Sequence, residues 1–113
     1  MPTVQILVIA PDSDLRRSLR FALEAERFAV TWRTGIDAAL VPAAYDCTIV
    51  DHDALGGSAA AARSFIRAFA PVVLLANHPH ELSPEVFRTL LKPGLGAPLI
   101  AAVHEALARA DRP

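Results

Sequence analysis

The sequence predicts an α/β protein with a five-stranded parallel sheet and helices on both faces. Two observations support this prediction. Short apolar, β-branched runs alternate along the chain with segments whose apolar residues recur at helical spacing. Such alternation requires crossover connections, which are right-handed and place helices on the faces of a parallel sheet. The 113 residues and the absence of an interdomain linker predict a single domain, 1–113.

The first strand and the first helix lie at the start of the chain. Residues 4–9 are apolar and β-branched apart from Gln5, which is typical of a strand buried on both faces. Turn and cap residues follow at 11–14. Leucines and alanines then recur at helical spacing, with arginines on the other side, and this pattern predicts an amphipathic helix that runs to about Glu26.

The middle of the chain predicts two further strands and two helices. We expect strands at 28–32 and 45–50, joined through a short helix at 35–40 that Pro42 ends. Ser58 is a suitable N-cap for the next helix, which should extend through Phe69.

The last third predicts the remaining elements. The run 72–75 should be the fourth strand, and Ser83 should start a helix of only about two turns, with proline at its first position. This helix must be short because Leu90 and Leu91 should form the fifth strand. A closing helix should begin at Pro98 and carry Leu99, Val103 and Leu107 on one face.

Composition excludes several classes of function. Hydrophobic residues make up 53% of the chain, and the net charge is −1 without a lysine or arginine run, so we expect no nucleic-acid binding. No apolar run is long enough to span a bilayer, and the N-terminus lacks a signal-peptide pattern. Cys47 is the one cysteine and lies in an apolar run, so no internal disulfide is expected. These features predict a cytoplasmic protein.

Chemistry in such a sheet is expected at the carboxyl ends of the strands. Asp51 directly follows the third strand, and Lys92 follows the fifth. Lys92 is the one lysine among eleven basic residues, all the others being arginine. Lysine is a compact point charge, whereas arginine is a planar fork. The placement predicts an aspartate and a lysine that face each other at one edge of the sheet.

The chain resembles the receiver domain of two-component response regulators along nearly its whole length. The resemblance rests on the order and spacing of the closing helix and of the segments ILVIA, DLRRSLRFALEA, YDCTIVD, APVVLLA and LLKP. It implies the flavodoxin-like strand order 2-1-3-4-5. It also implies that Asp51 is the phosphoacceptor position, which takes a phosphoryl group from a phosphohistidine. Lys92, followed by Pro93, would contact the aspartate or its phosphoryl oxygens.

The sequence also departs from the family pattern. The acid pair that holds magnesium falls on Ala10 and Pro11, and the nearest substitute carboxylate is Asp12. The switch serine or threonine is replaced by Ala76, and the aromatic switch residue by Thr89. The second and fourth helices are shortened.

These departures favour a degenerate receiver that is not an enzyme and acts by protein–protein interaction. Its partner would be a histidine kinase, a phosphotransfer protein or a downstream effector. A second copy of the chain, bound through the last helix–strand–helix face, is a further candidate. No output module is visible, so output should pass through a partner, unless the chain is a piece of a longer protein. No cofactor is expected under this hypothesis.

Two alternatives stay open at this point. In one, Asp51 is an active, atypical phosphoacceptor that uses magnesium, with Asp12 or Asp53 compensating for the acid pair. In the other, a small ligand- or metal-binding flavodoxin-like domain uses His52, His78 and Asp12; His80 lies in the same loop as His78. The histidines follow no standard ligand spacing, so the sequence favours solvated loop residues over metal ligands.

Overall fold

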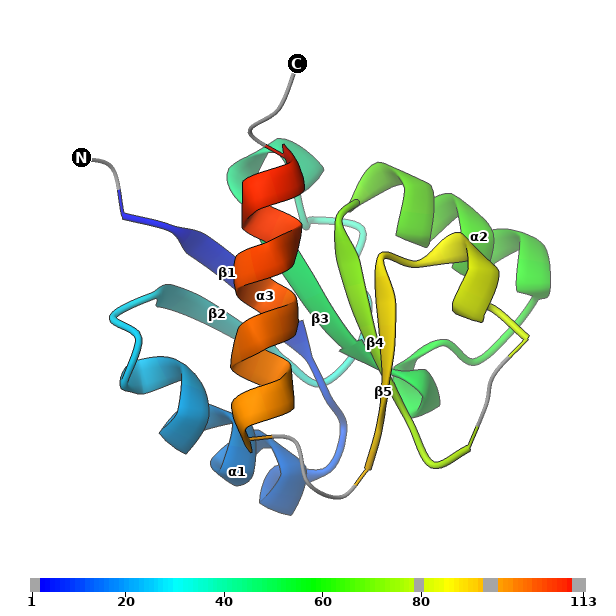
Figure 1. Cartoon of the computed structure of the whole chain (residues 1–113). Helices are drawn as coiled ribbons and strands as arrows, with labels where there is room; N and C mark the ends of the chain where they lie inside the picture. Colours follow the sequence, from blue (N-terminus) through cyan, green and yellow to red (C-terminus); the bar gives the residue numbers. More distant parts are fainter. Residues whose placement is uncertain (1–2, 79–80, 93–95, 111–113) are drawn as a thin grey trace.

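A five-stranded parallel sheet forms the centre of the molecule (Figure 1). The computed structural model describes residues 3–78, 81–92 and 96–110. The strand order is β2-β1-β3-β4-β5, and each neighbouring pair is parallel. The predicted fold class and strand order are therefore confirmed. The strands are β1 (Gln5–Ile9), β2 (Ala29–Arg33), β3 (Cys47–Asp51), β4 (Val72–Ala76) and β5 (Arg88–Leu91).

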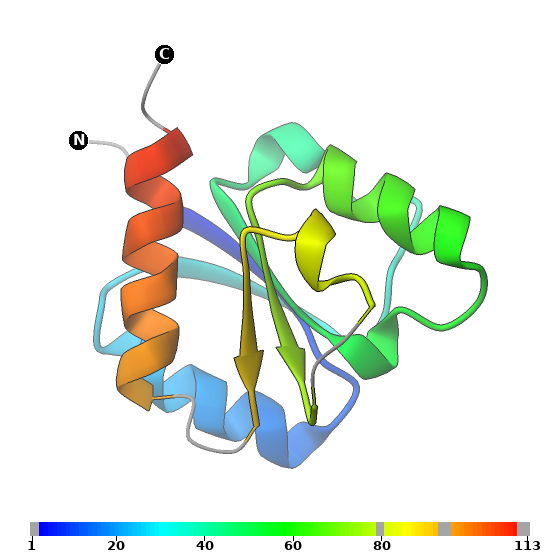
Figure 2. The same ribbon diagram turned by 45° about the vertical axis from the view of Figure 1, so that its right-hand side comes forward.

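Helices cover both faces of the sheet, as expected. Figure 2 shows α1 (Ser13–Glu24) and α3 (Gly96–Ala110) on one face, and α2 (Ala59–Ala68) on the opposite face. Among the described residues, no helix has the length and apolar character needed to cross a membrane.

Cap residues define where the first two helices begin. The Asp12 side chain accepts a hydrogen bond from the backbone N–H of Asp14 at 2.8 Å, and α1 starts at Ser13. Ser58 does the same for α2, because its Oγ accepts from the N–H of Ala61 at 3.0 Å. Such caps satisfy N–H groups that have no partner within the helix. The predicted role of Ser58 is confirmed.

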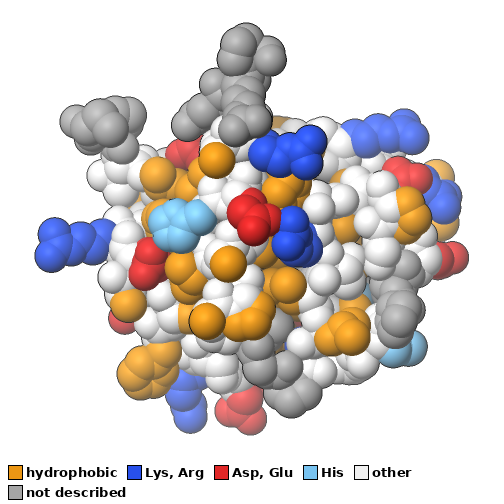
Figure 3. Space-filling model, in the orientation of Figure 1, with side chains coloured by type: hydrophobic (Ala, Val, Ile, Leu, Met, Phe, Trp, Pro, Cys, Tyr) orange, Lys and Arg blue, Asp and Glu red, His pale blue; other side chains and the backbone are white. Residues whose placement is uncertain are grey.

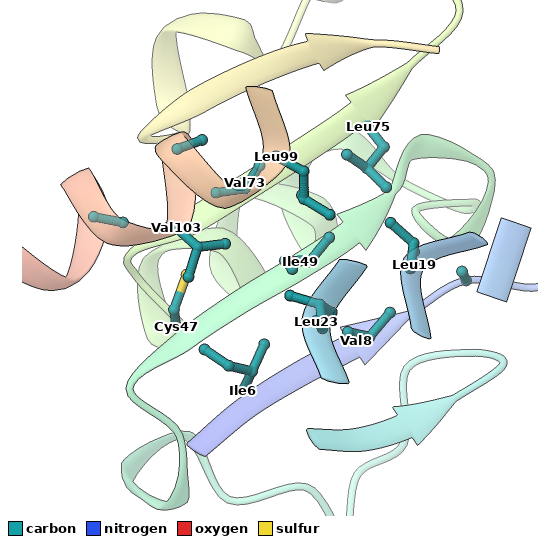
Figure 4. Close-up of a cluster of buried hydrophobic side chains, with 13 residues drawn as sticks. Ile6, Val8, Leu19, Leu23, Cys47, Ile49, Val73, Leu75, Leu99 and Val103 are labelled. Carbon is teal, nitrogen blue, oxygen red and sulfur yellow. The ribbon is translucent and has the colours of Figure 1, made fainter. Parts of the chain in front are cut away.

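Two hydrophobic clusters fill the layers on either side of the sheet. Figure 4 shows the first, in which Leu19 and Leu23 of α1 and Leu99 and Val103 of α3 pack onto strand residues such as Ile49. The second lies under α2 and includes side chains from the other face of the same strands. Burying each such aliphatic side chain contributes roughly 1.5–3 kcal/mol. The two layers hold the ends of β3, β4 and β5 in fixed positions.

The connection from β2 to β3 differs from the expectation. The predicted helix at 35–40 is wrong. The Asp37 carboxylate accepts a hydrogen bond from the N–H of Ala39 at 2.8 Å and forms a turn, followed by a 3₁₀ turn, η1 (Pro42–Ala44). A short aspartate side chain competes for backbone N–H groups in this way, and Pro42 cannot donate to a continuing helix.

The connection from β4 to β5 is also shorter than predicted. The helix expected after Ser83 is a single 3₁₀ turn, η3 (Ser83–Glu85), and the chain is already extended at Val86. The fifth strand begins at Arg88, earlier than expected, because Arg88 pairs with Val73 in the parallel ladder. The sequence predicted that the second and fourth helices are shortened. In the structure each is reduced to a single 3₁₀ turn, η1 between β2 and β3 and η3 between β4 and β5.

Cys47 gives a prediction about thiol reactivity. Burial at the start of β3 raises the pKa of Cys47 from an ordinary value of 9.0 to about 12. The thiolate is the reactive form, so a disulfide reagent at pH 8 should label the protein only after unfolding in urea. The proton is held more tightly in the folded state, so Cys47 should lower the free energy of unfolding as pH rises from about 9 to 12. Rapid labelling of the native protein would contradict this expectation.

Candidate functional site

The carboxyl ends of β3, β4 and β5 meet at one edge of the sheet, where Asp51 ends β3 and Lys92 follows β5. The structure brings these two residues together as the sequence predicted. The Nζ of Lys92 donates to Oδ1 of Asp51 at 3.0 Å. The adjacent ends of parallel strands explain how residues 41 positions apart come into contact.

The environment of this pair makes it a buried ion pair. The Asp51 side chain is 0% exposed, and that of Lys92 is 15% exposed. Oδ1 of Asp51 also accepts a long hydrogen bond, 3.4 Å, from the N–H of Asp53. Opposite charges interact more strongly where water is excluded, and removing one partner leaves the other charge uncompensated. The pair therefore fixes the end of β5 against the end of β3.

Arg16 holds the loop that follows β1. Its Nη1 donates to the carbonyl oxygen of Ala10 at 2.7 Å and to that of Pro11 at 2.9 Å. Ala10 itself is fully buried. Sequence reasoning placed Arg16 only on the polar side of α1. Its one available signal was its position in the first turn of α1, within reach of the preceding loop. A guanidinium from α1 thus ties this loop to the helix.

A cleft of about 600 Å³ opens beside the ion pair, between α1 and α3. Its polar end is lined by Asp12, Asp53, Asn77 and Lys92, and its floor by apolar side chains of both helices. Asp12 is exposed, and its Oδ1 is engaged in capping α1. One oxygen of its carboxylate therefore serves the helix N-terminus.

The predicted histidines differ in their surroundings. The Nε2 of His52 lies 3.5 Å from Oδ1 of Asp53 and 3.9 Å from Oδ1 of Asp51, and the His52 side chain is 17% exposed. The expectation of a solvated loop residue is therefore wrong for His52. His78 is exposed, and its ring centroid lies 6.5 Å from that of His52. His80 and Pro93 lie outside the described residues.

Solved structures place the fold among receivers. The receiver domain of an HD domain-containing protein from Pseudomonas fluorescens Pf-5 superposes with a TM-score of 0.79 at 19% identity, covering 97% of this chain and 90% of that one. The non-phosphorylated HemR receiver domain from Leptospira biflexa gives a TM-score of 0.78 at 18% identity, covering 98% of both chains. No family model matches the sequence.

A curated relative adds sequence evidence to the shared fold. The transcriptional regulator protein FixT of Rhizobium meliloti (strain 1021) is 33% identical over 102 residues, which cover 88% of this chain and 89% of that protein. The chain belongs to the response-regulator receiver family. Asp51 ends β3 and Lys92 follows β5, and these are the residues for which the sequence predicts the phosphoacceptor and phosphate-contact roles of a receiver.

The magnesium site that the receiver fold implies does not fit the residues present here. Magnesium requires near-octahedral oxygen ligands, of which carboxylates supply one or two. Ala10 and Pro11 offer no side-chain oxygen, and Asp12 caps α1. Asp51 already has one oxygen engaged by the ammonium of Lys92, and the side chain of Asp53, the other predicted substitute, is 60% exposed. The ligand set of an ordinary receiver is therefore incomplete in this chain.

The two predicted switch positions carry neither a serine or threonine after β4 nor an aromatic side chain on β5. Ala76 ends β4, is fully buried and pairs with Leu91, so no hydroxyl is present there to bond a phosphoryl group. Thr89 is half-buried on β5, and its Oγ1 donates to Oγ of Ser83 at 2.9 Å. That hydroxyl ties β5 to η3.

Proposed function

We propose that this receiver acts by binding a protein partner in a two-component or phosphorelay pathway, without using a phosphoryl switch. The observation that supports this proposal is the 3.0 Å contact between Lys92 and the buried carboxylate of Asp51. The ammonium supplies a positive charge where other receivers use a metal ion. The site is thus electrically balanced without a bound ion.

The proposal makes this chain a binding module and not a catalyst. Phosphoryl transfer depends on positioning and on neutralising the charge of the transferring oxygens. Ala10 and Pro11 remove the metal ligands, and Ala76 removes the hydroxyl that would follow the phosphoryl group inward. What the chain keeps is the scaffold and its surfaces, which are sufficient for protein binding.

Two surfaces are candidates for the partner. One is α1, where Phe21 is 79% exposed. The other is the face of β5 and α3, where Leu91 is 51% exposed. Figure 3 shows hydrophobic, acidic and basic side chains interspersed on the face that carries α3, which suits a protein better than a polyanion. We place a histidine kinase, phosphotransfer protein or downstream effector on one of these surfaces, and a second copy of the chain is the other occupant to test.

The alternative function, an active atypical phosphoacceptor, is favoured by the same two residues. Asp51 and Lys92 hold the positions that a receiver needs for the acceptor and its phosphate contact. Under this alternative, a phosphoryl group on Asp51 would draw Lys92 onto its oxygens. The two functions differ in whether a phosphoryl mimic binds.

Beryllofluoride with magnesium separates the two functions. We expect no change in Tm when both are added, and we expect Asp51→Asn to retain partner binding in a pulldown. Phe21→Ala should weaken that binding if α1 is the surface, with Arg67→Ala on α2, at the opposite face of the sheet, as the control. A clear rise in Tm with beryllofluoride and magnesium would establish the phosphoacceptor instead.

A further inference from the structure

We propose that the cleft between α1 and α3 binds a small amphipathic amine, with its ammonium at the polar end and its apolar body between the two helices. This inference goes beyond partner binding and does not depend on it. The cleft has a volume of about 600 Å³. Sites for small organic ligands usually have volumes of roughly 300–1,000 Å³ and combine apolar walls with a few polar groups. The cleft therefore has the size and the composition of a ligand site.

Small side chains leave the space between the two helices open. Ser18 and Ala22 of α1 and Gly96, the first residue of α3, all line the cleft. Leu19 and Leu99, which Figure 4 shows on the same two helices, close its floor and are almost fully buried. An apolar body that lies against these walls is removed from water, which favours binding.

The carboxylates at the polar end favour a cationic head group. Asp12, Asp14 and Asp53 line the cleft together with one basic residue, Lys92. The ammonium of Lys92 lies 3.0 Å from the buried carboxylate of Asp51, so the charges of that pair cancel. The cleft therefore carries an excess of negative charge, which attracts a cation and opposes a carboxylate or phosphate ligand.

The other charged groups nearby leave much of this excess in place. Within the described part of the chain, neither Asp12 nor Asp14 takes part in an ion pair. Asp53 has the imidazole of His52 at 3.5 Å, which is charged only when protonated. The guanidinium of Arg16 is held by carbonyl oxygens of the preceding loop. The N-terminal ends of α1 and α3, about half an elementary charge each, offset only part of the three carboxylate charges.

Calorimetric titration of the full chain at neutral pH and low salt tests the site, with phenethylamine and hexylamine as the probes. We expect one amine per chain with a millimolar or tighter Kd, as suits ligands of this size. Hydrocinnamate has the same apolar body as phenethylamine but carries a carboxylate, and it should bind at least about tenfold more weakly. Equal Kd values for phenethylamine and hydrocinnamate, or no binding of either amine at about 10 mM, would overturn the proposal.

Two variants place the binding in this cleft. Ala22→Leu fills the cleft from α1 without changing any charge and should weaken phenethylamine binding by about tenfold or more. Asp14→Asn removes one carboxylate and should weaken it by about threefold. Glu24→Gln is the matched control, because it removes a carboxylate from the same helix, where Glu24 pairs with Arg20 and does not line the cleft. It should leave the Kd unchanged.

The outcomes separate this site from the partner proposal. If Ala22→Leu does not fold, Asp14→Asn and the comparison with hydrocinnamate decide alone. Amine binding that both variants retain at full affinity would overturn the proposed site and leave the partner proposal untouched.

Discussion

Lys92→Met is expected to lower the free energy of unfolding by about 3–5 kcal/mol, measured by urea denaturation at neutral pH. The substitution leaves the carboxylate of Asp51 without its cation in a site where the aspartate side chain is 0% exposed. The lost contact is not the main cost. The main cost is that a buried charge has no compensating group and little water.

Two variants make this test specific. Arg88→Met breaks an ion pair with Glu105 on the surface of β5 and α3, where both side chains are about half exposed, and should cost less than about 1 kcal/mol. The double variant Asp51→Leu with Lys92→Met should recover most of the loss, because it removes both charges together. If Lys92→Met costs no more than Arg88→Met, the pair does not have the structural role assigned to it.

Phosphoryl transfer to Asp51 is expected to be at least about 100- to 1,000-fold slower than in a receiver with a complete acid pair. Losing one well-placed electrostatic group typically costs that factor. Here both metal-ligand positions are occupied by Ala10 and Pro11. The measurement is intact mass over time with acetyl phosphate and magnesium, against a receiver that retains both acids.

Asp51→Asn is the control for that measurement, because any mass increase that survives it does not come from Asp51. The Pro11→Asp variant tests the cause, since position 11 is exposed and a carboxylate there would restore one ligand. A rate in the native protein that matches the complete receiver would show that the acid pair is dispensable.

The contact between Asp51 and Lys92 could be predicted from the sequence, because neighbouring parallel strands end at the same edge of a sheet. That rule brought Asp51 and Lys92 together although 41 positions separate them. The rule could not predict that Asp51 is fully buried, because its burial depends on how closely β4, β5 and the 3₁₀ turn His52–Ala54 pack around it. Nor could it show Arg16 on two backbone carbonyls, because a long side chain can reach several acceptors from one helical position.

Errors in the fold fell on the two connections that became 3₁₀ turns. For 35–40, the alanines and leucine favour a helix, yet Asp37 bonds its own backbone and ends it. For the segment after Ser83, local capping signals were outweighed by a long-range contact, the pairing of Arg88 with Val73. Local propensity is a weak guide where so few residues separate two strands of one ladder.

The turns that replace these helices have a consequence for how the chain can change. Side chains from the two connections, including Leu40, Tyr45, Leu82 and Val86, pack into the hydrophobic cluster beneath α2. Surface loops ordinarily accept insertions and drift in sequence because they bury little. These two connections form part of the hydrophobic core, so they should tolerate neither insertions nor sequence drift. Variation in this protein should gather on the exposed sides of α1, α2 and α3.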